Sequence, residues 1–350
     1  MERGLVVAVD LQDPRMPLEP QLEEFMALAR AAGADIAGSV VQRRARIDPA
    51  TLVGSGKAGE IAQQAQALGA DTLFVFNDLK PRQRINLERL VPLRIIDRTM
   101  LILDVFAQHA RSREGKLQVE LAQLRYRQAN LIGVGTALSR LGGGIGTRGP
   151  GETKLETDRR QIGRRIAALR QALEGVRRQR ANRRASPKGQ PLVALVGYTN
   201  AGKSSLLNRL AGARDAYVAD QPFATLDPLV RRVWVADGKS VRLADTVGFI
   251  TELPEELLSA FRATLEELEG ASLLVHVIDA SNPDWARQKK SVEATLHELA
   301  LDEKPALEVF NKADRAVRSV PRGALRTSAL RGSGIAELRG AIAKRTAALR

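Results

Sequence analysis

The stretch VALVGYTNAGKSSLLNRL, residues 193–210, decides the fold of this 350-residue chain. Its central part fits the pattern G-x-x-x-x-G-K-[ST], with an apolar run before it and a helical pattern after it. The positions that match are Gly197, Gly202, Lys203 and Ser204. In a strand–loop–helix unit of this kind, backbone N–H groups surround the phosphates, the lysine reaches the β- and γ-phosphates, and the hydroxyl binds Mg²⁺. The stretch therefore predicts a nucleotide site in an α/β domain.

Two further elements follow strand-like runs later in the chain. Asp245-Thr246-Val247-Gly248 comes after SVRLA, where an aspartate can hold Mg²⁺ through water and a glycine can offer its N–H to a γ-phosphate. Asn311-Lys312-Ala313-Asp314 comes after ALEVF and resembles the N-K-x-D element of GTPases. In that element the aspartate accepts two hydrogen bonds from the guanine edge, whereas adenine presents the opposite polarity. The pattern favours guanine over adenine nucleotides.

Two shorter signals complete the set. Thr327-Ser328-Ala329 resembles the element whose backbone contacts guanine, and Thr225 in QPFATLDP stands where GTPases keep a switch threonine that closes on Mg²⁺ and the γ-phosphate. Five elements in the GTPase order predict a GTP-binding domain. The expected Mg²⁺ ligands are Ser204, Thr225 and, through water, Asp245, and the expected catalytic residues are Lys203, Thr225, Gly248 and Asn200. The expected GTP-binding residues are Gly197, Tyr198, Thr199, Asn200, Ala201, Gly202, Lys203, Ser204, Ser205, Phe223, Ala224, Thr225, Leu226, Asp227, Asp245, Thr246, Val247, Gly248, Asn311, Lys312, Asp314, Ser328, Ala329 and Leu330.

The residue after Gly248 bears on the rate of hydrolysis. Many GTPases have glutamine there to orient the attacking water, whereas this chain has Phe249. Phenylalanine cannot hydrogen-bond a water molecule, so we expect slow intrinsic hydrolysis that a partner, a backbone group or a cation completes. Asn200 is similar to the asparagine with which some such GTPases bind K⁺, so K⁺ is a candidate second cofactor beside Mg²⁺.

The positive charge of the chain is concentrated in one segment. The formal net charge is +14, but residues 1–110 carry 13 Lys and Arg against 14 Asp and Glu, and residues 191–350 carry 22 against 20. Residues 111–190 carry 19 against 6. A charge of one sign gathered in this way is typical of a surface that binds a polyanion, with a solvated helical face as the alternative.

The remaining patterns predict three domains in an α/β protein. Residues 1–110 are expected to form a small α/β domain with a largely parallel sheet, because helical stretches there alternate with β-rich runs. These runs lie at 5–11, 34–41 and 71–77. Residues 111–185 are expected to form an antiparallel helical hairpin with a glycine-rich tip, and residues 186–350 a P-loop GTPase domain with a mostly parallel sheet.

The hairpin is predicted from two helical stripes of apolar residues. The first consists of Leu117, Leu121, Leu124 and Leu131, and the second of Ile162, Ile166, Leu169, Leu173 and Val176. Two such helices can bury their stripes against each other. The tip would be LGGGIGTRGPGETKLETDRR (141–160), and ANRRASPKGQ (181–190) would be a linker. The arginines expected on the outside are Arg125, Arg127, Arg159, Arg160, Arg164 and Arg165.

Nearly the full length of the chain resembles the HflX family of GTPases, within the Obg-like group. The resemblance is carried by DRTMLILDVFAQHA (97–110), KLQVELAQLRY (116–126), LSRLGGGIGTRGPGETKLETDRR (138–160), FATLDP and DTVGFITELP. It implies a protein that binds the large ribosomal subunit, that splits or rescues stalled or idle ribosomes, and whose hairpin reaches ribosomal RNA near the peptidyl transferase centre. We also expect GTP and GDP as ligands, stimulation of hydrolysis by the ribosome, and a monomer.

The hairpin supplies the candidates for contact with RNA. Structured RNA is recognised mostly by shape and backbone, and arginine can stack on bases as well as pair with phosphates. The candidates are Arg148, Lys154, Arg159, Arg160 and Arg164. Two alternatives stay open: a GTPase that acts in ribosome subunit assembly or on tRNA, and a nucleotide-gated RNA-binding factor without catalysis. Some family members carry a further domain after the GTPase unit, whose functions are not expected of a chain that ends at Arg350.

A second glycine–lysine motif lies near the amino terminus. LVGSGKAGEI (52–61) places Gly54, Gly56 and Lys57 ahead of a helical pattern, which indicates either a second nucleotide site or a simple strand-to-helix turn.

Several classes of protein are excluded by composition. The chain has no cysteine, which excludes disulfides and thiolate metal sites. The start MERGLVVAVDLQD has acidic residues in its apolar run, so we expect no signal peptide, and no window approaches the roughly 18 apolar residues of a membrane span. A cytoplasmic protein is expected. His109, His276 and His297 lack metal-ligand spacing and are expected to be structural, and Trp234, on a strand, and Trp285, near a helix start, are expected to have packing roles.

Overall fold

The structure is a computed structural model that divides into two compact units. The first unit contains Met1–Gln108 and Lys116–Arg177, and the second contains His109–Gly115 and Arg178–Arg350. Among the residues described, no helix is long and apolar enough to pass through a lipid bilayer. The described residues are 2–13, 17–139, 150–184, 190–212, 223, 229–236, 238–250, 268–315 and 320–348.

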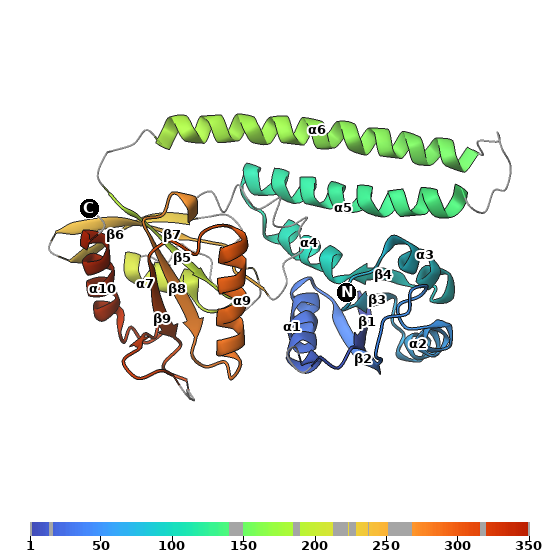
Figure 1. Cartoon of the computed structure of the whole chain (residues 1–350), viewed down its shortest axis with the longest axis horizontal. Helices are drawn as coiled ribbons and strands as arrows, with labels where there is room; N and C mark the ends of the chain where they lie inside the picture. The colour runs from blue at the N-terminus through green and yellow to red at the C-terminus, as the bar shows by residue number, and fades with distance from the viewer. Residues whose placement is uncertain are drawn as a thin grey trace. The chain divides into compact units, whose positions relative to one another are not determined.

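The first unit contains a four-stranded sheet in which neighbouring strands are parallel, in the order β2-β1-β3-β4 (Figure 1). β1 lies inside the sheet, and its apolar run LVVAV is buried on both faces, as is typical of parallel strands. The strands are β1 (Arg3–Asp10), β2 (Asp35–Arg43), β3 (Thr72–Val75) and β4 (Arg94–Asp97). The helices between and after them are α1 (Leu18–Ala31), α2 (Ser55–Leu68), α3 (Pro81–Leu90) and α4 (Arg98–His109).

Helices cover both faces of this sheet. Ile61 of α2 and Leu87 of α3 belong to the same apolar cluster as Val7 of β1, so α2 and α3 cover one face. α1 covers the other face, where Phe25 packs edge to face against Phe76 with 5.7 Å between the ring centroids. The small α/β domain with a parallel sheet that the sequence predicts is confirmed.

Two elements of this domain, β4 and α3, are not predicted from the sequence. The strand β4 is only four residues long and reads RIID, which is too short to establish a period of two. The helix α3 begins with Pro81, and the side chain of Gln83 accepts a hydrogen bond from the backbone N–H of Lys80 at 3.0 Å. A proline in the first turn and a residue that bonds back to the cap are start signals that could have found it.

A buried polar cluster attaches the next helix to this sheet. Asp97, at the end of β4, accepts hydrogen bonds from the guanidinium of Arg84 (2.6 Å), from the hydroxyl of Tyr126 and from the backbone N–H of Met100 (2.9 Å). Arg84 also donates to the carbonyl of Ile95 (2.8 Å) and to the Tyr126 oxygen (2.7 Å). A buried charge is tolerated when it is paired and hydrogen-bonded in this way. The cluster therefore links α3, β4 and the start of α4 with the helix that carries Tyr126.

That helix, α5 (Arg113–Ser139), runs beside α6 (Pro150–Arg184) as an antiparallel hairpin (Figure 1). The apolar stripes meet between the two helices, as the sequence predicts. Arg165 on α6 also pairs with Glu120 on α5 at 2.7 Å. The buried members of the cluster are Leu121, Ile166, Leu169 and Leu173, and its partly buried members are Leu117, Leu124 and Ile162.

The structure corrects three details of the hairpin. α6 begins at Pro150, and proline is favoured in the first turn of a helix. Residues 150–160 of the expected tip are therefore helical. α6 continues to Arg184, so residues 181–184 of the expected linker are helical too. Arg125, expected outside, is half-buried, and burial together with the nearby Arg170 lowers the pKa of its guanidinium. Residues 140–149 lie outside the described residues.

The second unit contains a six-stranded sheet in the order β10-β9-β8-β5-β7-β6, parallel except for the antiparallel pair β6 and β7. Apolar residues of α7 and α10 share one core with those of the central strands, and α9 contacts β8 and β5. The strands are β5 (Leu192–Gly197), β6 (Leu229–Ala236), β7 (Lys239–Asp245), β8 (Leu273–Asp279), β9 (Ala306–Asn311) and β10 (Leu325–Arg326). The helices described are α7 (Lys203–Ala211), α9 (Trp285–Glu298) and α10 (Ile335–Ala348).

Candidate guanine-nucleotide site

The loop between β5 and α7 is folded around a buried lysine. Lys203 begins α7 and is 6% exposed, and its Nζ donates to the carbonyl oxygens of Gly197 (3.0 Å) and Tyr198 (2.8 Å). Gly202, just before it, has a φ of +90°, and a side chain there would collide with the amide of Asn311. Glycine tolerates this backbone conformation and this close approach, whereas other residues do not. The sequence motif therefore has the local geometry that it predicts.

Burial sets the charge of this lysine. Removal from water lowers the pKa of the Lys203 ammonium to about 8; Asp245 opposes this shift, and Lys312 adds to it. The phosphates of a nucleotide would supply the negative charge that favours the protonated form. A buried ammonium group at this position is suited to bind an anion.

A hydroxyl and a carboxylate meet beside the loop. Ser204, the second residue of α7, donates a hydrogen bond from its Oγ to the Oδ2 of Asp245 at 2.5 Å. Asp245 ends β7, which pairs with β5, and the next residue, Thr246, donates to the carbonyl of Leu195 at 2.6 Å. Oxygen atoms of these two kinds are the ligands that Mg²⁺ prefers in proteins. Ser204 and Asp245, which the sequence separates by 41 positions, therefore fit a magnesium site.

The segment after β7 is bound to the phosphate loop through its backbone. The N–H of Phe249 donates to the carbonyl of Gly197 (3.1 Å), and the N–H of Thr199 donates to the carbonyl of Phe249 (2.7 Å). A side chain at Gly248 would lie 2.8 Å from the Cα of Thr199 and 3.2 Å from the Nζ of Lys203, so only glycine fits there. The phenyl ring of Phe249 is buried.

The two guanine elements lie together at the ends of β9 and β10. The Nδ2 of Asn311 donates to the carbonyl of Ala201 (2.9 Å), and its Oδ1 accepts from the N–H of Ala329 (3.1 Å). The hydroxyl of Ser328 donates to the Oδ1 of Asp314 at 2.5 Å. This bond comes first among the causes that lower the pKa of the Asp314 carboxyl. Asn311 thus ties the phosphate loop to the loop that carries Ser328 and Ala329.

Two residues that no sequence motif indicates support this region. Asp279, at the end of β8, pairs with the Nζ of Lys312 at 2.8 Å. Arg209 of α7 donates to the carbonyls of Ala329 (2.9 Å) and Leu330 (2.5 Å). An aspartate at the end of a buried strand, as at Asp245, is a signal that could have suggested Asp279. Arg209 belongs to no sequence motif. It reaches the loop of Ala329 and Leu330 only in the folded chain.

Some of the residues expected at the nucleotide site and in the hairpin lie outside the described residues. Phe223 is described and buried, with a φ of +58°. Lys154 lies in α6, whose outer side chains are described only in part. The expected residues outside the described part of the chain are Arg148, Ala224, Thr225, Leu226 and Asp227.

The amino-terminal glycine–lysine motif has a different environment. Gly54 precedes α2 with a φ of +83°, a backbone conformation that favours glycine. The side chain of Lys57 is 28% exposed, and its Nζ pairs with Glu60 of the same helix at 2.6 Å. Because the ammonium group of Lys57 pairs with a carboxylate of its own helix, the structure favours a simple turn before α2 over a second nucleotide site.

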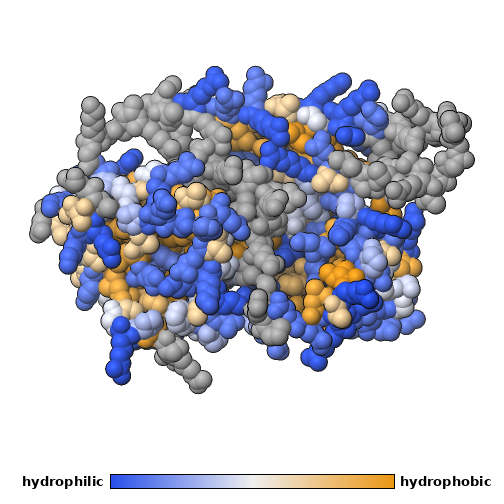
Figure 2. Space-filling view, in the orientation of Figure 1, coloured by the Kyte–Doolittle hydropathy of each residue, from blue (hydrophilic) through white to orange (hydrophobic). Residues whose placement is uncertain are grey.

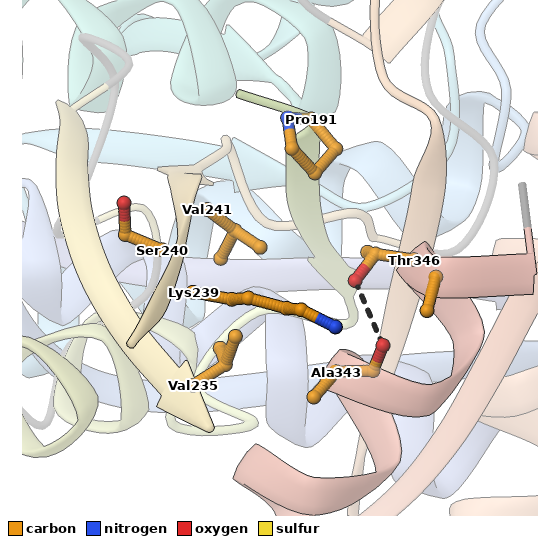
Figure 3. Close-up of a pocket in the computed structure, with 8 residues that line it drawn as sticks. Pro191, Val235, Lys239, Ser240, Val241, Ala343 and Thr346 are labelled. Carbon is orange, nitrogen blue, oxygen red and sulfur yellow. Dashed lines mark hydrogen bonds between the residues drawn. The ribbon is translucent and has the colours of Figure 1, made fainter. Parts of the chain in front are cut away.

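A cavity of about 160 Å³ lies at the opposite edge of the second sheet, where β5 and β7 begin (Figure 3). The side chain of Lys239 extends across it, and the hydroxyl of Thr346 donates to the carbonyl of Ala343 at 3.2 Å. The phosphate loop follows the other end of β5, so this cavity is separate from the nucleotide site. Its lining consists of Pro191, Val235, Lys239, Ser240, Val241, Ala343, Thr346 and Ala347.

The arginines of the hairpin face outward over the part of α6 whose side chains are described. Figure 2 shows hydrophilic residues along the outer side of the hairpin and apolar residues between its helices. Arg160 makes an ion pair with Glu156 of the same helix at 3.2 Å, and Arg159 and Arg164 are exposed. The expectation that these three residues contact RNA stays a prediction.

The architecture and the loop geometry together define the class: the second unit is the GTP-binding domain of a P-loop GTPase. Models of three protein families match the chain. They are described as GTP-binding GTPase N-terminal, which matches residues 19–107, GTP-binding GTPase Middle Region, which matches 109–186, and 50S ribosome-binding GTPase, which matches 192–312.

Individual relatives narrow the class to a family. The chain is 49% identical over 324 residues to GTPase HflX of Caldanaerobacter subterraneus subsp. tengcongensis, which covers 92% of this chain and 74% of that protein. It is 50% identical over 303 residues to GTPase HflX of Escherichia coli, which covers 86% of this chain and 71% of that protein. The chain belongs to the HflX family of GTPases, as its resemblance suggests, and it is a GTP-binding enzyme that hydrolyses GTP.

A solved structure has a similar fold over nearly the whole length of the chain. It is that of SsGBP in complex with GDP, which matches with a TM-score of 0.52 over 98% of each chain at 24% identity.

Proposed function

We propose that the GTP-bound form of this chain binds the large ribosomal subunit and splits or rescues stalled or idle ribosomes. The observation that carries the proposal is the hairpin: two long helices with a common apolar seam, joined to a folded domain through the Arg84–Asp97–Tyr126 cluster and lined on the outside by exposed arginines. A rigid basic projection of this kind suits a cavity lined with phosphates. The family description as a 50S ribosome-binding GTPase supports the same partner.

In this proposal, the nucleotide bound to the GTPase domain controls binding to the ribosome. In the proposed assignment, Lys203 holds the β- and γ-phosphates, the N–H of Gly248 faces the γ-phosphate, and Asp314 accepts hydrogen bonds from guanine. Ser204 and Asp245 hold Mg²⁺, with Thr225 as a further ligand in the GTP state. The metal, when bound, neutralises charge on the phosphates. The γ-phosphate would order the loops around Thr225 and 245–250 and so favour the form that binds the ribosome.

Slow intrinsic hydrolysis is part of the proposal. The ring of Phe249 is buried and its backbone is bonded to the phosphate loop, so this residue cannot orient a water molecule. We assign the missing function to K⁺ held with the help of Asn200, and to the ribosome as the stimulating partner. Rates of GTP hydrolysis in matched potassium and sodium buffers test the cation. Equal rates would contradict the assignment of K⁺.

Sedimentation with ribosomes tests the partner. Full-length protein is mixed with intact ribosomes or with large subunits in GTP, a non-hydrolysable analogue or GDP. We expect co-sedimentation with large subunits in the first two states, and loss of intact ribosomes. Binding to precursor particles alone would favour subunit assembly instead, and equal binding in all nucleotide states would contradict nucleotide control.

The contribution of the hairpin is tested with a triple variant, Arg159→Ala, Arg160→Ala and Arg164→Ala. If these residues bind phosphates, the slope of log affinity against log salt should fall by about 1 for each phosphate that is no longer neutralised. Arg322→Ala, which removes an exposed charge from the second unit, is the control. An unchanged slope would remove these residues from the interface.

Base specificity is tested separately with Asp314→Asn. An asparagine amide can pair with the edge of xanthine, whereas it loses the bonds to guanine, so affinity should shift from guanine to xanthine nucleotides. Retained preference for GDP would show that Asp314 does not contact the base.

A further inference from the structure

The exposed face of the β6–β7 ribbon carries an unusual group of side chains. Residues of β6 alternate between the two faces of the sheet: Val233 and Val235 enter the core with α7 and α10. On the opposite face Trp234 is 54% exposed and Val230 is 40% exposed. The packing role expected of Trp234 is therefore not in the core, whereas Trp285 packs edge to face against Phe310.

Two guanidinium groups lie beside this indole. Arg232 of β6 lies directly opposite Arg242 of β7 in the antiparallel register, and both side chains are exposed. Like charges at directly opposite positions of an antiparallel pair are unfavourable. In the part of the chain that the structure describes, no carboxylate makes an ion pair with either of them. An anion from outside the chain would remove this repulsion.

The group is also held in a defined arrangement. The guanidinium of Arg232 stacks over the ring of Trp234 at 4.6 Å from its centroid and donates to the hydroxyl of Ser240 at 3.1 Å. Ser240 lies opposite Trp234 in the ribbon and accepts a second hydrogen bond, from Gln190, at 2.9 Å. An ordered arginine next to an exposed aromatic ring loses less entropy when a ligand binds.

We propose that this face binds unpaired nucleotides of ribosomal RNA, with a base stacked on Trp234 and the adjoining phosphates held by Arg232 and Arg242. RNA is the partner whose chemistry uses both features, because its phosphates pair with guanidinium groups and its bases stack on aromatic rings. An acidic protein segment would use the charges but leave the indole exposed. The inference rests on the proposed ribosomal partner and adds to it a contact on the GTPase domain.

This contact would lie on the same β-ribbon as Asp245, one residue of the proposed nucleotide site. At the other end of the ribbon, Leu229 pairs with Asp245, the residue that accepts the hydrogen bond of Ser204. RNA bound at Trp234 would therefore engage a strand pair that also positions a proposed ligand of Mg²⁺.

The first experiment observes Trp234 directly. The chain has two tryptophans, so Trp285→Phe leaves Trp234 as the sole indole. Titration of this variant with a single-stranded oligoadenylate should quench its emission, because stacked bases quench indole. Adding Arg232→Ala and Arg242→Ala should weaken the binding and lower its salt slope by about 1 for each phosphate that is no longer neutralised. Absence of quenching overturns the inference whether or not ribosomes bind.

The second experiment uses the ribosome. Trp234→Ala in the full chain should weaken binding to large subunits by about 5- to 160-fold, which corresponds to the loss of one base–aromatic stack. Lys290→Ala and Arg322→Ala remove single exposed charges elsewhere in the domain and should leave binding unchanged. A photoreactive benzophenone side chain in place of Trp234 should crosslink to ribosomal RNA.

The outcomes separate this inference from the proposed function. If the unaltered chain binds large subunits and Trp234→Ala binds equally well, the inference fails while the proposed function stands. Crosslinking to a ribosomal protein alone also overturns it. If the unaltered chain binds no ribosomal particle in any nucleotide state, the proposed function fails, and the oligoadenylate titration still decides whether this face binds RNA.

Discussion

The two sheets of this chain, the first parallel throughout and the second parallel except for β6, use the same edge for different purposes. In both, the carboxyl ends of the strands bring polar side chains together, as parallel topology requires. In the first sheet, Asp97 is bound by Arg84 and Tyr126 from the chain itself. In the second, Ser204 and Asp245 stand beside a loop wrapped around the ammonium group of Lys203. At the carboxyl ends of its strands, the first sheet has a joint, a polar cluster that connects helices to the sheet. The second sheet has at the same position a site suited to an exchangeable ligand.

The two glycine–lysine motifs differ in the same way: one lysine pairs with a residue of its own domain, and the other is enclosed by a loop that can bind a ligand. Lys57 extends along the surface of α2 to Glu60, whereas Lys203 turns back to the carbonyls of its own loop. Lys203 directly follows Gly202, which has a positive φ, whereas the positive-φ glycine near Lys57 is Gly54, three residues before it. A glycine and a lysine in sequence are therefore insufficient for a phosphate site, and the enclosure of the ammonium group is the decisive feature.

The largest expected effect is at the joint in the first sheet. Asp97→Ala would leave the buried guanidinium of Arg84 without its carboxylate, at a cost of about 3–5 kcal/mol of unfolding free energy. Urea unfolding followed by circular dichroism measures it, with the exposed Asp35→Ala as the control. Affinity for GDP should be unchanged. A loss of under about 1 kcal/mol would show that the cluster does not hold the joint together.

The next effect is at the ligand edge. Lys203→Ala should weaken GDP and GTP binding by about 100-fold, because a charge-assisted contact to phosphate contributes up to about 3 kcal/mol. Titration with a fluorescent guanine nucleotide measures the affinity. The variant removes a buried cation but also leaves the carbonyls of Gly197 and Tyr198 without this donor, so the stability of the free protein should change little. Nucleotide affinity within a factor of about 3 of the original would contradict the comparison.

A smaller effect concerns acid stability of the second sheet. Burial lowers the pKa of His276 in β8 to about 4; Lys289 of α9 and Lys203 act in the same direction, and Glu308 of β9 opposes them. The unfolded chain has the ordinary histidine pKa of 6.5, so it binds more protons than the folded chain below that pH. Stability is therefore retained above pH 6.5 and should fall by about 1 kcal/mol between pH 7 and pH 5.5.

Tryptophan emission measures this loss, because Trp234 and Trp285 both lie in the second unit. His276→Gln should flatten the dependence on pH over the same range. The strands of the first sheet contain no histidine, so no matching loss is expected there. If His276→Gln keeps the full dependence, another group is responsible.

The smallest effect is expected at the amino-terminal motif. Lys57→Ala removes a partly exposed ion pair within one helix, which contributes at most about 0.5 kcal/mol. Binding of guanine and adenine nucleotides should stay as in the unaltered chain, measured by the titration used for Lys203→Ala. A clear loss of adenine-nucleotide binding would revive the second nucleotide site and break the comparison between the two loops.

The parts of the site that could be predicted are those that depend on local sequence. The phosphate loop needs glycine at defined backbone angles and a lysine that begins a helix, and all of these lie within a few residues. The guanine elements were found for the same reason, because each follows a strand end. Asp279 and Arg209 were missed, since each acts on an element distant in the sequence.

The fold was predicted to a similar extent. Long periodic segments, such as the stripes of α5 and α6, were correctly interpreted, whereas the four-residue strand β4 was not. The exposure of Trp234 is not predictable from the sequence, because the alternation along LVRRVWVA shows only that Val233 and Trp234 face opposite ways. Which of those faces is covered depends on where α7 and α10 pack.

The sequence by itself determined that this chain is a GTP-binding protein with a basic helical hairpin, because motif spacing, helical period and charge are properties of neighbouring residues. Only the tertiary structure decided that Asp97 closes a joint, that Ser204 meets Asp245, and that Trp234 lies exposed beside two arginines. Such contacts join residues from separate elements, and burial or exposure depends on what the rest of the chain places over them.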